Sequence, residues 1–519
     1  HVTYNEGQSW EIISPDLTRN DPKTLGPSGG PITKDNTGVE YYGTIFAVAE
    51  SPIEKNLIWT GSDDGLVHIS TDGKTWKNVT PKNMPEWMMI NAIEVHPTKK
   101  GSAYIAGTRY KLGDYKPYIY KTENYGKSWK LIVDGIENES FTRVVRADPT
   151  RKDLLYAGTE KGMYISFDDG DHWTPFQLNL PIVPITDLTI KDDNLIAATQ
   201  GRSFWIIDDL TPLYQLTTST SKEDITLFAP KASYQISGGR GATSRTQGTN
   251  HPGGVAVYFN INEMNEKDTI SLSFYDANKK SIQRFSNYPD TKNDEKKLTV
   301  KKGSNVFYWD MMYPSATSVK GMILWWASLS GPMALPGTYT VSLTVANKTF
   351  EKPFSILKNP VSETSLTDMK LQFDFINEIN AKVSEIHKAL INIATIKAQV
   401  KSLQASIKDK EKHKDLIKFS NELTKKLTTI ETTLYQTKSK SGQDPLNFPI
   451  RLNNKLAHLN SLTRMGSYRP TDQDIAFKNE ITKDIDVELK KVYALFTKEV
   501  QLLNQKVKES QIDLIQLEN

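Results

Sequence analysis

One eight-residue pattern constrains the fold more than any other feature of the sequence. It reads Ser/Thr-x-Asp/Asn-x-Gly-x-Ser/Thr-Trp, and it occupies residues 3–10, 70–76, 122–129 and 166–173. The second copy is one residue short, and His172 replaces the hydroxyl residue in the last copy. The acidic or amide side chain can bind backbone amides in a hairpin turn, the glycine supplies a positive φ, and the tryptophan buries a large ring.

This pattern is the Asp box, and we interpret its polar residues as turn formers. The predicted structural set is Asn5, Gly7, Trp10, Asp72, Trp76, Asn124, Gly126, Trp129, Asp168, Gly170 and Trp173. Asp168 to Asp171 also invites a calcium interpretation, because alternating carboxylates are calcium ligands. Their place inside an Asp box favours the turn, and we predict neither a metal nor a cofactor.

Short apolar strands repeat in step with the boxes. The predicted inner strands are Gly43–Glu50, Ala92–His96, Thr142–Ala147 and Thr186–Ile190, and two further strands follow each of them. Four short strands in a unit of about 45 residues are typical of a propeller blade. We therefore predict that residues 1–218 form propeller blades, the last of which lacks an Asp box. Residues 1–15 supply only a final hairpin, so we expect upstream blades of the same protein, or a second chain, to close the ring.

Two different architectures are expected after the propeller. Residues 225–357 carry period-2 strands such as Val255–Phe259 and Thr338–Val345, which predict an immunoglobulin-like β-sandwich. Residues 361–519 carry apolar side chains at steps of three and four, which predict an α-helical hairpin or bundle. Thr471, which follows Pro470, is the expected N-cap of the last helix.

Composition excludes several classes of function. The absence of cysteine rules out disulfides, thiolate metal sites and a cysteine nucleophile. A net charge of +3 argues against a dedicated nucleic-acid binder. No apolar run reaches the roughly 18 residues of a membrane helix. Because the chain opens at His1 without an initiator methionine, we expect a mature, cleaved or partial product.

Several segments together resemble a bacterial family of sortilin-like, BNR-repeat proteins. The segments are Ile13–Asp21, Gly26–Glu50, Gly201–Leu210, Gly321–Trp325, Leu335–Tyr339 and Asn447–Asn454. The resemblance covers essentially the whole chain and places it in the C-terminal half of such a protein. It implies export, to the cell surface, the outer membrane, the medium or the periplasm of a Gram-negative bacterium, and a large propeller. Members are often labelled glycosyl hydrolases, but the resemblance supplies no catalytic residues.

The sequence contains no recognisable set of catalytic residues. The arginine triad of a sialidase is not recognisable, and no pair of acids stands out as the two carboxylates that a glycosidase needs. The fragment Asp63-Asp64-Gly65 is interpreted as a turn. The eight histidines show no metal-ligand spacing.

The expected ligand-binding face is the propeller rim, where loops between the second and third strands meet the loops between blades. The rim should gather Trp87, Arg109, Tyr110, Lys111, Asp114, Tyr115, Arg143 and Arg202. The long loop Thr108–Pro117, with its aromatic and charged residues, suits recognition of a glycan or peptide.

Two functions remain open at this stage. The first is an extracytoplasmic binding and scaffold protein of a cell-envelope complex, whose rim recognises a protein, peptide or glycan and whose helices contact an envelope partner. The second is a carbohydrate-active hydrolase, sialidase-like or xyloglucanase-like, with catalytic residues partly in upstream blades. The sequence leaves enzymatic activity undecided and favours the binding function.

Overall fold

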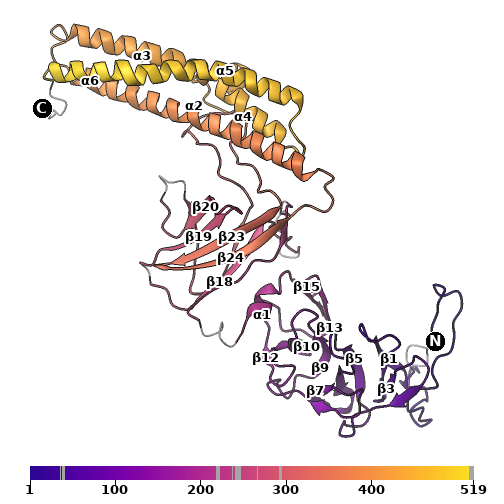
Figure 1. The fold of residues 1–519 in the computed structure, drawn as a ribbon. Coiled ribbons are helices and arrows are strands. Elements are labelled where there is room, and N and C mark those ends of the chain that lie inside the picture. The colour runs from indigo at the N-terminus through magenta and orange to yellow at the C-terminus, as the bar shows by residue number, and fades with distance from the viewer. Residues whose placement is uncertain are drawn as a thin grey trace. The chain divides into compact units, whose positions relative to one another are not determined.

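The computed structural model describes residues 1–34, 37, 41–217, 223–236, 238–239, 247–265, 267–290 and 295–512. The chain divides into two compact units, His1–Leu216 and Thr217–Asn519. Figure 1 shows sheets in the first unit, and sheets followed by long helices in the second. Within these ranges, no helix combines the length and the apolar character that crossing a bilayer requires.

The first unit consists of four consecutive antiparallel sheets, each a meander in sequence order. The first sheet contains β1 (Ile45–Glu50), β2 (Ile58–Ser62), β3 (Val67–Ser70) and β4 (Trp76–Asn78). The second contains β5 (Met89–Val95), β6 (Ala103–Arg109), β7 (Asp114–Thr122) and β8 (Lys130–Leu131). The third contains β9 (Thr142–Ala147), β10 (Leu155–Thr159), β11 (Gly162–Ser166) and β12 (Thr174–Pro175). The fourth contains β13 (Ile185–Lys191), β14 (Asn194–Thr199) and β15 (Phe204–Ile207), and the short helix α1 (Thr211–Gln215) follows it.

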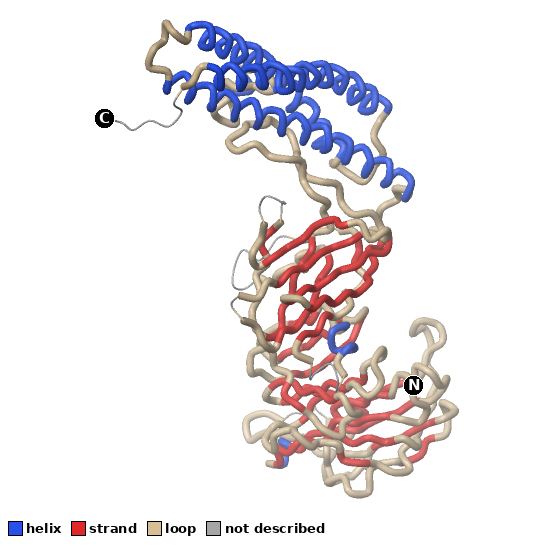
Figure 2. Tube along the Cα trace, turned by 60° about the vertical axis from the view of Figure 1, so that its left-hand side comes forward, coloured by secondary structure: helices blue, strands red, loops and turns tan. Residues whose placement is uncertain are grey.

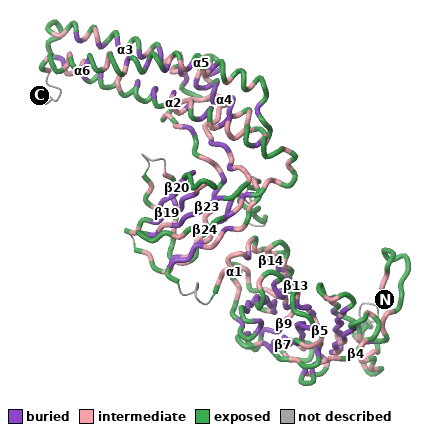
Figure 3. The backbone as a smooth tube through the Cα atoms, in the orientation of Figure 1, coloured by how far each residue is buried: buried purple, intermediate pink, exposed green. Residues whose placement is uncertain are grey.

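These sheets have the arrangement of propeller blades. The first strands β1, β5, β9 and β13 contact one another in succession, and the burial colours of Figure 3 show purple segments where these strands meet. Each predicted inner strand overlaps one of them, so the four predicted inner strands are confirmed as the first strands of four antiparallel sheets. The fourth blade has three strands and no Asp box, as expected.

The Asp boxes form the predicted turns. The Oδ1 atom of Asn124 accepts a hydrogen bond from the backbone amide of Ser128 at 2.9 Å, and Asp168 receives the amide of His172 in the same way. The Gly126 amide donates to the hydroxyl of Thr122 at 3.0 Å, with φ at +78°. The short second copy keeps this geometry, because Asp72 accepts the amides of Lys74 and Thr75.

The second unit begins with two β-sheets that share one core. A three-stranded sheet has the order β16-β18-β22, and a six-stranded sheet has the order β17-β24-β23-β19-β20-β21. Phe259 of the first sheet and Phe274 and Phe354 of the second belong to the same buried cluster, so this part is a β-sandwich. The immunoglobulin-like label stays a prediction. The strands are β16 (Ile225–Leu227), β17 (Ser233–Tyr234), β18 (Val255–Ile261), β19 (Ile270–Tyr275), β20 (Ser281–Ser286), β21 (Lys296–Lys297), β22 (Gly303–Trp309), β23 (Gly337–Val345) and β24 (Lys348–Leu357).

The C-terminal part is helical, and Figure 2 shows its long helices running alongside one another. Its elements are α2 (Leu366–Ser406), α3 (Lys414–Leu434), η4 (Asp444–Leu446), α4 (Leu452–Thr463), α5 (Asp472–Ala494), the π-helical turn η5 (Leu495–Glu499) and α6 (Val500–Glu509). The predicted apolar seams form one buried core, which includes Ile386, Leu427 and Ile485. Thr471 is the N-cap of α5, and with Asp474 it completes a capping box.

An irregular segment, residues 314–331, lies against these helices and is held by asparagine side chains. Asn454 accepts the amide of Trp325 at 2.7 Å and donates to the carbonyl of the same residue at 2.9 Å. Asn380 and Asn460 both donate to the carbonyl of Ser330. A segment without regular structure must find partners for its buried peptide groups, and these amides supply them.

Candidate functional site

A pocket of about 370 Å³ opens in the first unit where the first two blades meet, and it contains half of the predicted rim residues. Its lining includes Trp87, Arg109, Tyr110 and Lys111, all of which the sequence placed at the rim. The remaining lining residues are Thr24, Tyr42, Asp63, Met89, Thr108 and Leu112. A concave surface that combines aromatic rings with a few charged groups is the usual form of a ligand site.

The basic side of the pocket is a structured hairpin rather than the long loop that the sequence predicted. β6 extends to Arg109, a 3-10 turn covers Tyr110–Leu112, and β7 begins at Asp114. Arg109 and Asp114 face each other across the hairpin, with guanidinium and carboxylate 3.0 Å apart. Gly113 closes the turn with φ at +73°. The ion pair and this glycine continue the strand pairing and hold Tyr110 and Lys111 at the tip.

The opposite wall depends on the backbone around Trp87. Trp87 has a positive φ of +60°, which is uncommon for a bulky residue. Its ring stacks on Tyr42 at a centroid distance of 6.2 Å, and the guanidinium of Arg19 lies 4.6 Å from its centroid. Gly65 makes this arrangement possible, because a Cβ there would lie 2.9 Å from the amide nitrogen of Met88.

A second aromatic cluster extends the site from Tyr110 toward the third blade. Tyr110 stacks on Phe141 with a centroid distance of 5.1 Å, and Tyr115 approaches the same ring at 6.3 Å. The guanidinium of Arg143 lies 5.2 Å from the Phe141 centroid and pairs with Glu160 at 2.7 Å. Tyr115 remains exposed, so it is available to a ligand. Together with the pocket, this cluster forms what we call the rim site.

The carboxylates of the rim site are already engaged. Asp63 accepts the amides of Gly43 and Thr44, and Asp64 accepts the amide of Arg19 at 2.7 Å. The fragment Asp63-Asp64-Gly65 is therefore a turn, as predicted, although Asp63 also lines the pocket.

Asp114 is committed in the same way. Burial alone would raise the pKa of Asp114, but hydrogen bonds from Tyr118, the Lys116 amide and Arg109 outweigh it and lower the pKa. Burial and the hydrogen bond to Asp114 in turn raise the pKa of Tyr118 to about 12. Asp114 is thus held as an ion, which does not suit a group that must deliver a proton near neutral pH.

Lys111 differs from the other cations around the pocket. It is exposed at the hairpin tip, and none of the acidic side chains in the described ranges forms an ion pair with it. Arg109 and Arg143 are neutralised by Asp114 and Glu160. The rim site therefore offers an exposed lysine, without an acidic partner among the described residues, beside several aromatic rings.

The structure brings together seven of the eight predicted rim residues. Arg202 stands apart: it is exposed in the loop between β14 and β15 and does not line the pocket. Sequence reasoning missed Arg19, Tyr42 and Phe141. Arg19 and Tyr42 lie in the irregular stretch before β1, where no periodicity marks them, although both lie within segments that carry the family resemblance.

The acidic residues of the last Asp box contact protein groups. Asp168 binds the amide and ring of His172, and Asp171 pairs with Lys130 at 2.6 Å. Asp169 receives the hydroxyl of Tyr104 and the ammonium of Lys121, the latter at 2.7 Å. Asp169 thereby links the third blade to the second. Across the described part of the chain, no group of three or more acidic or histidine side chains is arranged to hold a metal ion.

Comparisons with known proteins give no family assignment. No family model matches the chain, and no curated protein matches it. Among solved structures, the chain is similar to YCF48 bound to D1 peptide, with 16% identity over 42% of this chain and 65% of that one, at a TM-score of 0.26.

Two GH74 structures also match. An ancestral GH74 enzyme is 17% identical over 47% of this chain and 33% of that one, with a TM-score of 0.27. The GH74 xyloglucanase from Xanthomonas campestris is 13% identical over 60% of this chain and 45% of that one, with a TM-score of 0.28. In all three matches the chain covers less than two thirds of the other protein.

Proposed function

We propose that this chain is a binding and scaffold protein whose rim site recognises a protein, peptide or glycan. The observation that carries the proposal is the rim site itself, a preformed pocket with aromatic walls from Trp87, Tyr42 and Tyr110. Aromatic faces bind apolar side chains and sugar rings alike, because both offer flat apolar surfaces. The exposed Lys111 favours a ligand that carries an acidic group.

The electrostatics favour binding over hydrolysis. A glycosidase needs two carboxylates that face each other across the scissile bond, one of them able to donate a proton. Asp63 and Asp64 are instead held by backbone amides, and Asp114 is held by the guanidinium of Arg109. We therefore place the hydrolase second, and a panel of glycan substrates tests it: turnover by the chain, or by a longer form of the protein, would contradict the binding proposal.

The binding proposal is tested with arrays of peptides and glycans, each in acidic and neutral versions. The variant is Lys111→Gln combined with Tyr115→Ala, since both side chains are exposed and neither is part of the core. The control is Lys127→Gln combined with Tyr4→Ala, which removes the same groups from exposed positions outside the rim site. We expect some acidic ligands to bind the wild type and the control equally well. The same ligands should bind the rim variant at least tenfold more weakly. Equal binding by all three proteins would reject the rim site.

We also propose that a further Asp-box blade covers the free face of β1. In β5, both faces of the strand carry buried apolar residues, whereas β1 buries Ala47 and leaves Phe46 and Val48 exposed, Val48 by 70%. The buried apolar residues of β5 and β9, by contrast, belong to the clusters in which neighbouring blades pack together. Upstream blades of the same protein, on one chain or as a separate fragment, are the proposed occupant.

The proposed location is outside the cytoplasm, at the cell surface, in the medium or in the periplasm, with the helices available to a partner in the cell envelope. Fractionation of the native cells tests this proposal directly. Recovery of the protein in the cytoplasmic fraction would contradict it.

A further inference from the structure

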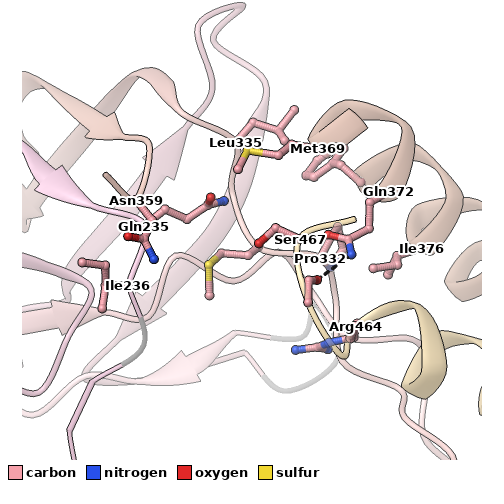
Figure 4. Close-up of a pocket in the computed structure, with 13 residues that line it drawn as sticks. Gln235, Ile236, Pro332, Leu335, Asn359, Met369, Gln372, Ile376, Arg464 and Ser467 are labelled. Carbon is pink, nitrogen blue, oxygen red and sulfur yellow. Dashed lines mark hydrogen bonds between the residues drawn. The ribbon is translucent and has the colours of Figure 1, made fainter. Parts of the chain in front are cut away.

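A second pocket, of about 280 Å³, lies within the second unit, between the β-sandwich and the first turns of α2. Figure 4 shows Gln235, Ile236 and Asn359 on one side of it and Gln372, Ile376 and Arg464 on the other. The rim site has no part in this pocket, and no segment singled out as a candidate site in the sequence analysis contributes to it. Its volume is close to the lower end of the range for small-molecule sites, about 300 to 1,000 Å³.

Arg464 is the charged group of this pocket. Its guanidinium donates one hydrogen bond, from Nη1 to the carbonyl of Gly331 at 3.1 Å. In the described ranges no carboxylate pairs with it, and its half-burial lowers the pKa of the guanidinium with no acidic neighbour to oppose the shift. A guanidinium keeps its charge in proteins, so a half-buried one without a counter-ion is unfavourable until an anion binds.

The helical wall of the pocket is apolar. Met369, Phe373 and Ile376 follow one another at steps of four and three, so they share one face of α2. Leu335 and Pro332 add apolar surface from the segment that leads into β23. This wall can receive a hydrocarbon chain or ring.

The polar side chains around the pocket are fixed by the protein itself. Gln372 donates to the carbonyls of Thr463 and Gly466, both at 2.7 Å, and Gln235 donates to the carbonyl of Ala334 at 2.7 Å. The bonds of Gln372 fix the helical side of the pocket around Arg464, and the bond of Gln235 fixes its sandwich side. The pocket is therefore preformed, which reduces the entropy cost of binding.

We propose that this pocket binds a small amphipathic carboxylate. The carboxylate pairs with Arg464, for which a guanidinium provides two parallel donors, and the apolar part of the ligand packs on Met369, Phe373 and Ile376. The proposal is independent of the rim site, since the two pockets share no residue.

Octanoate is the probe, and 1-octanol is the neutral ligand of matched chain length. Calorimetric titration of the full chain should show one saturable octanoate site and at least tenfold weaker binding of octanol. Arg464→Gln should weaken octanoate binding at least tenfold, and Arg464→Lys should weaken it less. Arg469→Gln is the matched control, because this exposed arginine lies outside the pocket, and it should bind as the wild type does.

A second variant keeps the test decisive if Arg464→Gln loses its fold. Ser467→Phe fills the pocket and leaves the arginine in place, so it should also abolish octanoate binding. In a methionine-labelled chain, octanoate should shift the methyl signals of Met333 and Met369. The proposal is overturned if octanoate shows no saturable binding, if Ser467→Phe binds it as tightly as the wild type, or if neither methyl signal moves.

Discussion

The indole Nε1 of Trp129 donates a hydrogen bond to the backbone carbonyl of Val79 at 2.7 Å, and this bond joins the second blade to the first. The same relationship recurs. Trp76 donates to Ile13 at 2.7 Å and Trp173 donates to Ile132 at 2.9 Å. Each acceptor stands three residues after the tryptophan of the preceding Asp box. The Asp-box tryptophan is therefore a connector between consecutive blades as well as part of the turn.

Removing this donor should weaken the blade contact. Trp129→Phe keeps an aromatic ring but leaves the Val79 carbonyl without its partner, and we expect a loss of about 1 to 2 kcal/mol in stability. Native-state hydrogen exchange of the amides of β1 to β8 measures the loss. The control is Trp10→Phe, because the Trp10 ring is 60% exposed. Equal effects of the two substitutions would contradict the connector role.

Gly65 should control the rim site through the backbone. Gly65→Ala places a Cβ 2.9 Å from the Met88 amide nitrogen at a φ of +89°, so the turn that presents Trp87 must move. We expect a loss of stability above about 1 kcal/mol and weaker binding at the rim site. Gly201→Ala is the matched control, because Gly201 lies outside the rim pocket and has a similar φ of +84° with no atom within 4 Å of the added Cβ. That variant should bear only the cost of its backbone conformation, about 1 kcal/mol, measured by the same denaturation and binding assays.

A partly buried glutamate, Glu94, should make the first unit less stable as the pH rises. Burial raises the pKa of Glu94 from 4.5 to about 7, although Arg146 and the Ala147 amide oppose the shift. Between pH 4.5 and about 7, the folded state binds more protons than the unfolded state. The free energy of unfolding therefore falls as the pH rises through this range.

The substitution Glu94→Gln tests this linkage. The variant cannot ionise at this position, so its melting temperature should fall less between pH 4.5 and about 7 than that of the wild type. Glu137→Gln, which changes an exposed carboxylate in the same unit, is the control. Parallel curves for the wild type and Glu94→Gln would contradict the assignment.

The asparagines that hold residues 314–331 should be essential for the helical part. Asn454→Ala leaves both the amide and the carbonyl of Trp325 without their partner, and we expect a loss of about 2 to 4 kcal/mol, because unpaired buried groups each cost about 1 to 3 kcal/mol. Urea unfolding followed by far-ultraviolet circular dichroism measures it. Asn504→Ala, at an exposed position of α6, is the control and should change stability by less than about 0.5 kcal/mol.

The sequence predicted those elements whose residues follow a repeating pattern. The Asp boxes located the blade hairpins, and the apolar seam from Ile376 to Ile407 predicted α2. Residues 314–331 have no such period, because their peptide groups are held one by one by side chains distant in the sequence. Two segments singled out in the sequence, Gly321–Trp325 and Asn447–Asn454, are joined in the folded unit by the Asn454–Trp325 pair.

The part of the rim site in segment Thr108–Pro117 could be predicted from the sequence. The parts formed by contacts between residues distant in the sequence could not. Arg19 reaches Trp87, and Phe141 reaches Tyr110, only after the blades have packed. The second pocket could not be predicted from the sequence for the same reason, since Gln235 and Arg464 come to line one pocket only in the folded unit.

The most direct test of the central claim is site-specific photo-crosslinking in the native cells, with benzoylphenylalanine in place of Tyr115 at the rim or of Tyr4 outside it. Both tyrosines are exposed, so both replacements should preserve the fold. We predict a covalent adduct to a protein or glycan ligand from position 115 and none of that mass from position 4. The absence of an adduct at position 115, or the same adduct from both positions, would contradict a binding function at the rim.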